Sequence, residues 1–443
     1  MSGDRLEGLS PQEKRTARFE AWLEAGDVEF VSSQAKDEHR QRVQRLIDVI
    51  ELRKPDRIPI SLAVGFYPAK YAGITAQEAM YDYEKMAAAW QKFTFDFGLD
   101  YCPGTMGAGS GRTLELLDYR LFRWPGNGLP EDIPYQCVEA EYMKPDEYDE
   151  LIADPSAFVM GKYLGRICGK LEAFRKIPSL FNSLEFPTFL GALNGLGNAE
   201  VQDALKALLE AGREAARWHG IAAAASKSMG AHGLPSIGGG FSKAPFDAIG
   251  DMLRGTVGLM NDMYRRPENV LEALERLTPT FIEMGKGVRF GGCPVVTLPL
   301  HKGADGFMSD AQFKKFYWPT LKAVILALIE EGLVPRLFAE GGYNSRLEVL
   351  KELPPGTTIW HFDQTDMAKA KEKLGDRMCL MGNLPAHVLI SASPEEAIDY
   401  CKNLIDVAGK DGGYIFSTGA VMDNARPENL KTVIETVKTY GRY

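Results

Sequence analysis

Length, composition and charge already narrow the class of protein. The chain has 443 residues, of which 45% are hydrophobic and 25% charged, and its formal net charge is −9. These fractions are typical of a folded globular protein and exclude a disordered or collagen-like chain. The acidic balance argues against nucleic acid as a partner, because phosphate binding needs a basic surface.

The sequence carries no sign of a membrane or secreted protein. No stretch approaches the roughly 20 apolar residues of a membrane helix, and the N-terminal segment lacks the apolar run of a signal peptide. The cysteines form no Cys-x-x-Cys pair, which indicates reduced thiols. We therefore expect a cytoplasmic protein with no membrane partner.

The first third of the chain begins with a helical extension. Residues 1–55 are polar and have the apolar spacing of two helices. The strand-like segment IPISLAV at 58–64 follows Pro55 and Pro59, so we expect the main domain to span 56–443. A helix over 76–97 and a short strand over 98–102 are expected next.

The middle of the chain, residues 130–235, has the least regular pattern. Helices are expected here at 145–151, 157–174 and 200–218. A strand over 234–240 and a helix over 246–264 then restore a regular order.

The C-terminal half alternates strands with helices. The expected strands are 293–300, 334–339, 358–362, 378–381 and 414–417. The expected helices are 310–331, 346–353, 368–373, 394–407 and 426–440. Such alternation predicts a parallel sheet with crossover helices. A closed (β/α)8 TIM barrel fits the count better than an open doubly wound sheet, which would leave polar edge strands.

Polar residues follow the ends of several of these strands. In a TIM barrel the chemistry lies at the C-terminal ends of the strands, so these residues are expected to face one mouth. They are His301, Glu340, His361, Asp363, Asn383, Ser417 and Thr418.

Three C-terminal segments resemble the uroporphyrinogen decarboxylase superfamily. They are RLFAEGGYNSRLEVL, WHFDQTDMAKAKEKLGDRMCLMGNLP and FSTGAVMDNARPENLKTVIETVKTYG. Gly240-Phe241 with Pro245 resembles a second signature of the family. The resemblance covers roughly residues 56–443 and also implies a (β/α)8 barrel.

The family includes decarboxylases of uroporphyrinogen and methyltransferases that use a corrinoid or a thiol. The decarboxylases need arginines near the first strand, where SLAVGFYPAKYAG has none. They also need an aspartate where Gly107 stands, and a tyrosine and a histidine where Asp251 and Ala420 stand. These departures favour the methyltransferase branch.

Within that branch, the residues fit ether demethylation better than thiol methylation. The thiol-methylating members carry cysteines at the strand ends, and here Glu340 and Thr418 or Gly419 occupy those places. Some corrinoid-dependent O-demethylases hold zinc with a glutamate and a histidine separated by twenty residues, as Glu340 and His361 are. The resemblance implies zinc on this pair, with His301 or Asp363 as third ligand.

The zinc would act as a Lewis acid on the ether oxygen, and the corrinoid of a partner protein would accept the methyl group. Asp363 would orient His361. The catalytic residues are then expected to be Glu340, His361 and Asp363, and the metal ligands Glu340, His361 and His301. The substrate is expected to contact His301, Asn383, Phe241 and Tyr101.

We therefore expect a methyltransferase that moves a methyl group from a small methoxylated or methylamine-type compound to the cobalt of a corrinoid protein. One alternative is a decarboxylase acting on a tetrapyrrole or another carboxylated ring. A second is a non-catalytic corrinoid or tetrapyrrole binder. Relatives in the family are commonly dimers, so the resemblance allows a homodimer.

Overall fold

The structure is a computed structural model that describes residues 6–26, 28–104, 108–179 and 183–443. Gly107 lies outside the described residues. At its centre is a parallel sheet of six strands in the order β4-β5-β6-β7-β8-β9. These strands are β4 (Gly240–Phe241), β5 (Val295–Leu300), β6 (Val334–Ala339), β7 (Ile359–Phe362), β8 (Cys379–Met381) and β9 (Tyr414–Ile415).

Two further segments extend the sheet at its edges by single bridges. Ile60 and Val64 each form one parallel bridge beyond β9, with Phe416 and Met422, and Cys102 forms one with Ser236, before β4. The segments predicted as strands over 58–64 and 98–102 are therefore present as bridges, not as ladders. The parallel α/β architecture agrees with a TIM barrel, while closure of the barrel stays a prediction.

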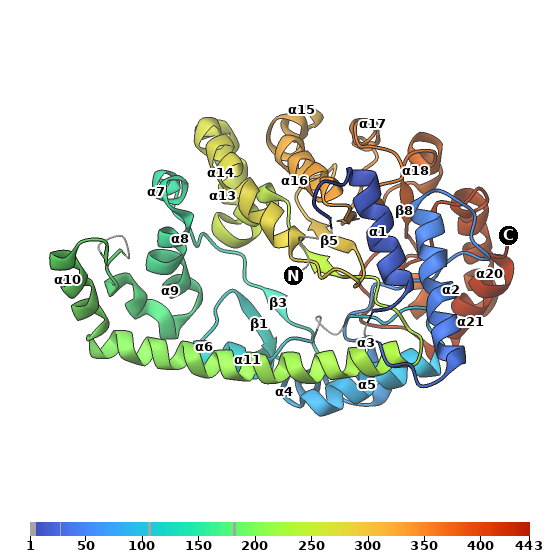
Figure 1. The fold of residues 1–443 in the computed structure, drawn as a ribbon, viewed down its shortest axis with the longest axis horizontal. Coiled ribbons are helices and arrows are strands. Elements are labelled where there is room, and N and C mark those ends of the chain that lie inside the picture. Colours follow the sequence, from blue (N-terminus) through green and yellow to red (C-terminus); the bar gives the residue numbers. More distant parts are fainter. Residues whose placement is uncertain (1–5, 27, 105–107, 180–182) are drawn as a thin grey trace.

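Helices follow the strands of the C-terminal half and cover the outer side of the sheet (Figure 1). They are α12 (Pro245–Ala248), α13 (Gly255–Arg265), α14 (Pro267–Lys286), α15 (Asp310–Gln312), α16 (Trp318–Glu330), α17 (Leu347–Leu350), α18 (Met367–Leu374), α19 (Ala386–Ile390), α20 (Pro394–Leu404) and α21 (Pro427–Tyr440). Three π-helical turns continue α12, α15 and α20: η4 (Ile249–Leu253), η5 (Phe313–Tyr317) and η6 (Ile405–Gly409). The strands predicted for this half and the helices between them are present, but α14 and α19 were not predicted, and the helix expected over 310–331 is divided into α15, η5 and α16.

The helix predicted over 76–97 is wrong as a single element. The structure has α4 (Ala76–Tyr81) and α5 (Tyr83–Asp96), separated at Asp82. The Asp82 side chain accepts a hydrogen bond from the backbone N–H of Lys85 and so caps α5. Aspartate favours this capping position over a helix interior, because its carboxylate satisfies a free N–H group.

The remaining elements lie before β4. They are α1 (Pro11–Leu23), α2 (Ser33–Ile50), α3 (Tyr67–Ala72), α6 (Gly111–Leu117), β1 (Phe122–Pro125), β2 (Gly128–Leu129), β3 (Gln136–Cys137), α7 (Tyr148–Ala153), α8 (Pro155–Phe158), η1 (Val159–Tyr163), α9 (Leu164–Ile167), η2 (Gly169–Lys176), α10 (Phe186–Leu196) and α11 (Ala199–Ala231). The single helix predicted over 157–174 is thus a series of short helical pieces.

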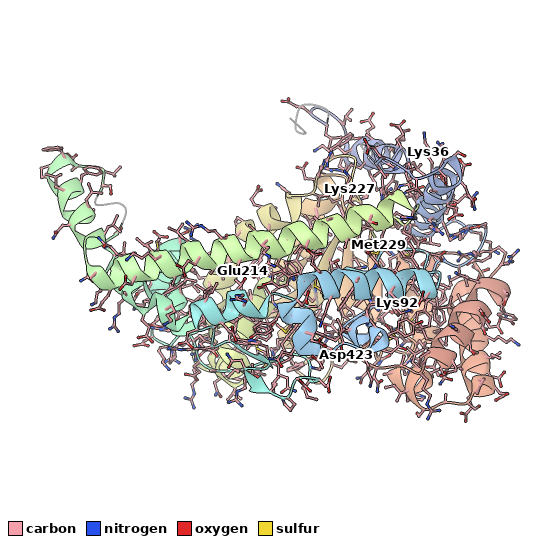
Figure 2. All side chains as sticks on the ribbon, turned by 90° about the horizontal axis from the view of Figure 1, so that it is seen from below. Lys36, Lys92, Glu214, Lys227, Met229 and Asp423 are labelled. Atoms are coloured by element: carbon pink, nitrogen blue, oxygen red, sulfur yellow. The ribbon has the colours of Figure 1, made fainter. Side chains whose placement is uncertain are left out.

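The helix α11 is 33 residues long and lies along one side of the molecule, where Figure 2 labels Glu214 and Met229 on it. At its N-terminal end it carries α10, which projects away from the sheet (Figure 2). Among the described residues, none of the helices is long and apolar enough to cross a membrane.

The helices α1 and α2 form an apolar floor beneath the strands. Phe19 and Trp22 of α1 join the same buried cluster as Val334 of β6 and Ile359 of β7. Both strand residues stand at the N-terminal ends of their strands, so the helices cover that end of the sheet. The opposite, C-terminal end is left for the loops that follow the strands.

Candidate active site

A cavity of about 590 Å³ lies inside the sheet, above the apolar floor. The strands β5 to β8 contribute Thr297, Arg336, Phe338, His361 and Met381 to its wall. Other apolar residues complete the wall: Ile60, Leu62, Val64, Leu99, Ile237, Phe241 and Val421. This size and mainly apolar lining suit a small organic ligand.

The alternation of side chains along β6 sets the depth of each group. Val334 belongs to the floor, and Arg336 and Phe338 line the cavity. Glu340 is the next residue on that face. Its N–H donates to the carbonyl of Leu300 (3.2 Å), so the pairing of β5 with β6 continues past Ala339. Glu340 therefore stands above Phe338, just beyond the residues that line the cavity, and we call this position the mouth.

His301 follows β5 and meets Glu340 at this mouth. The distance from His301 Nε2 to Glu340 Oε1 is 3.8 Å. The other ring nitrogen, Nδ1, is 2.5 Å from Asp251 Oδ2. Asp251 also pairs with Lys243 (2.7 Å) and Lys302 (3.3 Å).

This arrangement sets the charges at the mouth. Burial acts to raise the pKa of Asp251, but the bond from His301 and the charge of Lys243 hold it well below its usual range. Asp251 is therefore an acceptor, and Nδ1 of His301 is the donor. Burial acts to lower the pKa of His301, but the bond to Asp251 and its charge raise it above 6.5. The arrangement favours a protonated imidazole whose Nε2–H faces Glu340.

Glu340 is a carboxyl group that binds a proton more readily than usual. Its pKa is raised by burial and by the charge of Asp363, against the opposing effect of His301. Its side chain is still 45% exposed, so it can exchange protons with solvent. Together, His301 and Glu340 form a pair of proton carriers at the mouth.

Asp247 holds the loop that carries His301. It is fully buried and accepts hydrogen bonds from the backbone N–H groups of His301 (3.0 Å) and Lys302 (2.8 Å) and from the hydroxyl of Tyr317 (2.8 Å). Asp247 lies on α12 and Asp251 on η4, so one continuous helix positions both aspartates against this loop.

His361 lies deeper than the sequence suggested. It is buried, its Nε2 is 2.7 Å from the carbonyl of Thr418, and its ring stacks on Phe338 with centroids 4.4 Å apart. Because the carbonyl can only accept, Nε2 carries the hydrogen. Burial lowers the pKa of His361 to about 3, so the ring is neutral. The ring of His361 is therefore part of the cavity wall, and its hydrogen is held on Nε2.

Asp363 and Asn383 face a different cavity, of about 840 Å³, next to α18 and α20. Asp363 accepts a hydrogen bond from the N–H of Gly341 (3.0 Å), and between these described residues no hydrogen bond joins it to His361. The Asn383 amide donates to the carbonyls of Asp363 (3.0 Å) and Thr365 (2.7 Å). Both side chains thus hold the loop after β7.

Phe241 and Tyr101 line the cavity, as expected for substrate contacts. Phe241 is 45% exposed and stands at the rim. The Tyr101 hydroxyl donates to the carbonyl of Arg42 on α2 (3.1 Å), so it points toward the floor. Tyr101 therefore offers its ring, and not its hydroxyl, to the cavity.

The donor set for zinc is incomplete in this arrangement. His301 and Glu340 lie together, but His361 Nε2 is engaged by Thr418. Among the described residues, no group of three His, Cys, Asp or Glu side chains is placed to hold a metal ion. Catalytic zinc usually takes three protein ligands. The pair alone does not fit that pattern, so no step below depends on zinc.

Sequence reasoning missed two important groups. Asp251 was noticed only as a replacement for a tyrosine, although the Asp-x-x-x-Asp spacing with Asp247 hinted at two carboxylates on one helix face. Arg336 was missed entirely. Its position in VPRLFA, two residues from Val334 and two from Phe338, was the available signal of an inward-facing cation.

Comparison with known proteins locates this site in a family domain. Residues 225–440 match the model of the family described as uroporphyrinogen decarboxylase (URO-D). This segment contains every strand of the six-stranded sheet. The chain thus carries a URO-D family domain, and the resemblance drawn from the sequence is confirmed.

Curated relatives are distant and match only in part. The uroporphyrinogen decarboxylase of Aromatoleum aromaticum is 28% identical over 142 residues, 31% of this chain and 39% of the relative. That of Syntrophotalea carbinolica is 24% identical over 204 residues, 45% of this chain and 58% of the relative. The chain thus matches well under two thirds of the length of either relative.

A solved methyltransferase from Methanosarcina mazei resembles the structure over a greater length. The TM-score is 0.59, and the match covers 90% of this chain and 98% of that one, at 14% sequence identity. This likeness shows a common fold.

Proposed function

We propose that the protein is a methyltransferase that takes a methyl group from a small methoxylated or methylamine-type compound and passes it to the cobalt of a corrinoid held by a partner protein. The observation that carries this proposal is the pair His301 and Glu340, which lies next beyond Phe338, a residue in the wall of a small, mainly apolar cavity. The likeness of the fold to a solved methyltransferase supports it.

The chemistry requires activation of a poor leaving group. The corrinoid supplies the nucleophile that receives the methyl group. As the carbon–oxygen bond of a methyl ether breaks, its electron pair goes to oxygen, and His301 donates the Nε2 proton there. The products are the demethylated alcohol or phenol and the transferred methyl group. Glu340, partly exposed, returns a proton from solvent to the imidazole.

The residues around the pair prepare this proton transfer. Asp251 orients the ring and favours its charged form, because it accepts from Nδ1. Asp247 holds the loop through two backbone N–H groups. The apolar wall excludes water from the reacting bond, which strengthens the interactions of charges inside the cavity.

The cavity fits uroporphyrinogen poorly. Among the described lining residues, Arg336 is the single charged side chain, and His361 is neutral. One cation cannot balance an octa-anionic tetrapyrrole. Decarboxylation of a smaller carboxylated ring, or binding without turnover, remains the rival to be tested.

The test is an anaerobic assay with cob(I)alamin as acceptor and a panel of methoxylated aromatic compounds and methylamines. We expect loss of the methyl group from one donor and equal methylation of the acceptor. H301Q should lower kcat by about 10² to 10⁴ fold, the range for loss of a general acid. H387Q, on α19, is the matched control. Conversion of uroporphyrinogen to coproporphyrinogen, or tight corrinoid binding with no turnover of any donor, would contradict the proposal.

Zinc assistance is a separate proposal carried by the Glu340–His361 spacing. His301 and Glu340 lie together, but His361 Nε2 is engaged by the carbonyl of Thr418, so the described residues as placed do not complete a zinc site.

A further inference from the structure

The cavity holds, just above its apolar floor, a cation that no carboxylate of the described residues balances. Arg336 lines the cavity two residues above the apolar floor. One of its N–H groups donates to Thr297 Oγ1 (2.8 Å). No carboxylate of the described residues lies within ion-pair distance of it. Among the described residues its remaining N–H groups have no acceptor, and the cavity that Arg336 lines is open to them.

Some other buried arginines have a carboxylate partner, whereas Arg15 and Arg18 donate to backbone carbonyls instead. Arg254 pairs with Asp262 (2.6 Å), and Arg45 pairs with Asp56 (2.7 Å). Burial lowers the pKa of Arg336, since no nearby carboxylate offsets the burial. A buried charge without a partner is costly, so such groups usually have a counter-charge. At Arg336 no described residue supplies one, whereas a ligand in the cavity could.

We propose that Arg336, assisted by Thr297, binds the carboxylate of a small ligand whose apolar body fills the cavity. The planar guanidinium matches a carboxylate with two parallel hydrogen bonds. A single cation in an otherwise uncharged wall selects a ligand with one negative charge. The apolar and aromatic wall, which includes the Phe338–His361 stack, suits a flat ring as the body.

The distance along β6 relates this anion site to the mouth. Arg336 and Glu340 are four residues apart, or about 13 Å of strand at about 3.3 Å per residue. A ring with substituents on opposite sides spans this distance when hydrogen bonds of about 3 Å are added at each end. This last step rests on the proposed function: the carboxylate would lie at Arg336 and the methoxyl oxygen near His301.

Direct binding tests the proposal without any methyl transfer. The probes are benzoate, its uncharged analogue benzamide, and inorganic phosphate, measured by calorimetry on the full chain. We expect benzoate to bind about 10 to 100 fold more tightly than benzamide, the effect of a charged hydrogen bond. R336Q should remove this preference, T297V should weaken it, and R123Q, which removes an exposed charge, should leave it unchanged.

A stability measurement separates ligand binding from a structural role. If Arg336 serves a ligand, R336M should leave the Tm unchanged or raise it, and benzoate should raise the Tm of the wild type but not of R336M. Equal affinity for benzoate and benzamide, tighter binding of phosphate than of benzoate, or a wild-type preference retained in R336Q would overturn the proposal.

Failure of this proposal can be told apart from failure of the methyltransferase. Benzoate binding that depends on Arg336, in a protein with no methyl transfer, would support the anion site and contradict the proposed function. Methyl transfer from 4-methoxybenzoate with a KM unaffected by R336Q, together with equal binding of benzoate and benzamide, would support the function and overturn the anion site.

Discussion

The imidazole of His301 is held by the carboxylate of Asp251, with 2.5 Å between Nδ1 and Oδ2. The two residues come from different parts of the fold, the loop after β5 and the turn η4. The bond favours the charged imidazole and aims the opposite nitrogen at Glu340, 3.8 Å away. If His301 is the proton donor, this relationship controls the pH range of activity.

The first prediction concerns D251N and the alkaline side of the pH–rate profile. Protonated His301 is the active form, so activity should fall as pH rises through the raised pKa of His301, above 6.5. Loss of the Asp251 charge should lower that pKa and move the alkaline limb to lower pH. The measurements are kcat against pH and an NMR titration of the His301 ring.

The control for this variant is D411N. Asp411 is 81% exposed, and its charged partner is Lys54, not a residue of the mouth. It should leave the limb in place. An unchanged limb in D251N, together with an unchanged His301 titration, would contradict the role given to Asp251.

The second prediction concerns removal of metal. Since no group of three His, Cys, Asp or Glu side chains among the described residues is placed to hold a metal ion, we expect treatment with a strong chelator to leave methyl transfer and the Tm unchanged. Metal analysis before and after treatment is the measurement. Stoichiometric zinc that is lost in E340Q, with activity restored by added zinc, would instead support the ligand set implied by the Glu340–His361 spacing.

The strands of the C-terminal half could be predicted because their apolar runs are short and separated by clear turns. The expected bounds 334–339 are those of β6 (Val334–Ala339). The helix expected over 76–97 was wrong because the apolar periodicity continues through Asp82. The Asp82 side chain, which accepts a hydrogen bond from the N–H of Lys85, caps α5 and separates it from α4. Periodicity does not detect a cap inside an apolar pattern.

The candidate site was predictable only where strand ends define it. The rule that polar residues gather at strand ends brought His301 and Glu340 together, as found at 3.8 Å. It could not reveal Asp251, because its contact with His301 depends on how a helix packs on the next loop. It also could not reveal that Thr418 engages His361 through a backbone carbonyl, which no side-chain pattern encodes.

The third prediction concerns His361 and acid stability. Burial lowers its pKa from 6.5 to about 3, so the unfolded chain takes up a proton that the folded protein does not. The stabilising effect is therefore complete above pH 6.5 and is lost as pH falls toward 3. Between pH 6.5 and about 5, this group should lower the free energy of unfolding by about 2 kcal/mol.

H361Q is the comparison for this effect, since its amide can still donate to the carbonyl of Thr418. Its free energy of unfolding should fall less steeply over the same range, as measured by urea titration at each pH. H387Q should follow the wild type. Parallel curves for wild type and H361Q would show that His361 titrates normally.

The fourth prediction concerns the apolar floor beneath the cavity. Trp22 of α1 is 3% exposed and packs in the cluster that includes Val334 and Ile359. Replacing it with alanine should lower the free energy of unfolding by about 3 to 5 kcal/mol, the usual cost of removing a large buried side chain. V31A, at a position that is 60% exposed, should lower the free energy of unfolding only slightly.

The measurement is urea unfolding, with benzoate affinity determined under conditions where W22A is folded. Because Arg336 stands directly above this floor, a loosened floor should also weaken benzoate binding. A W22A protein of wild-type stability would show that α1 and α2 contribute little to the strands they cover.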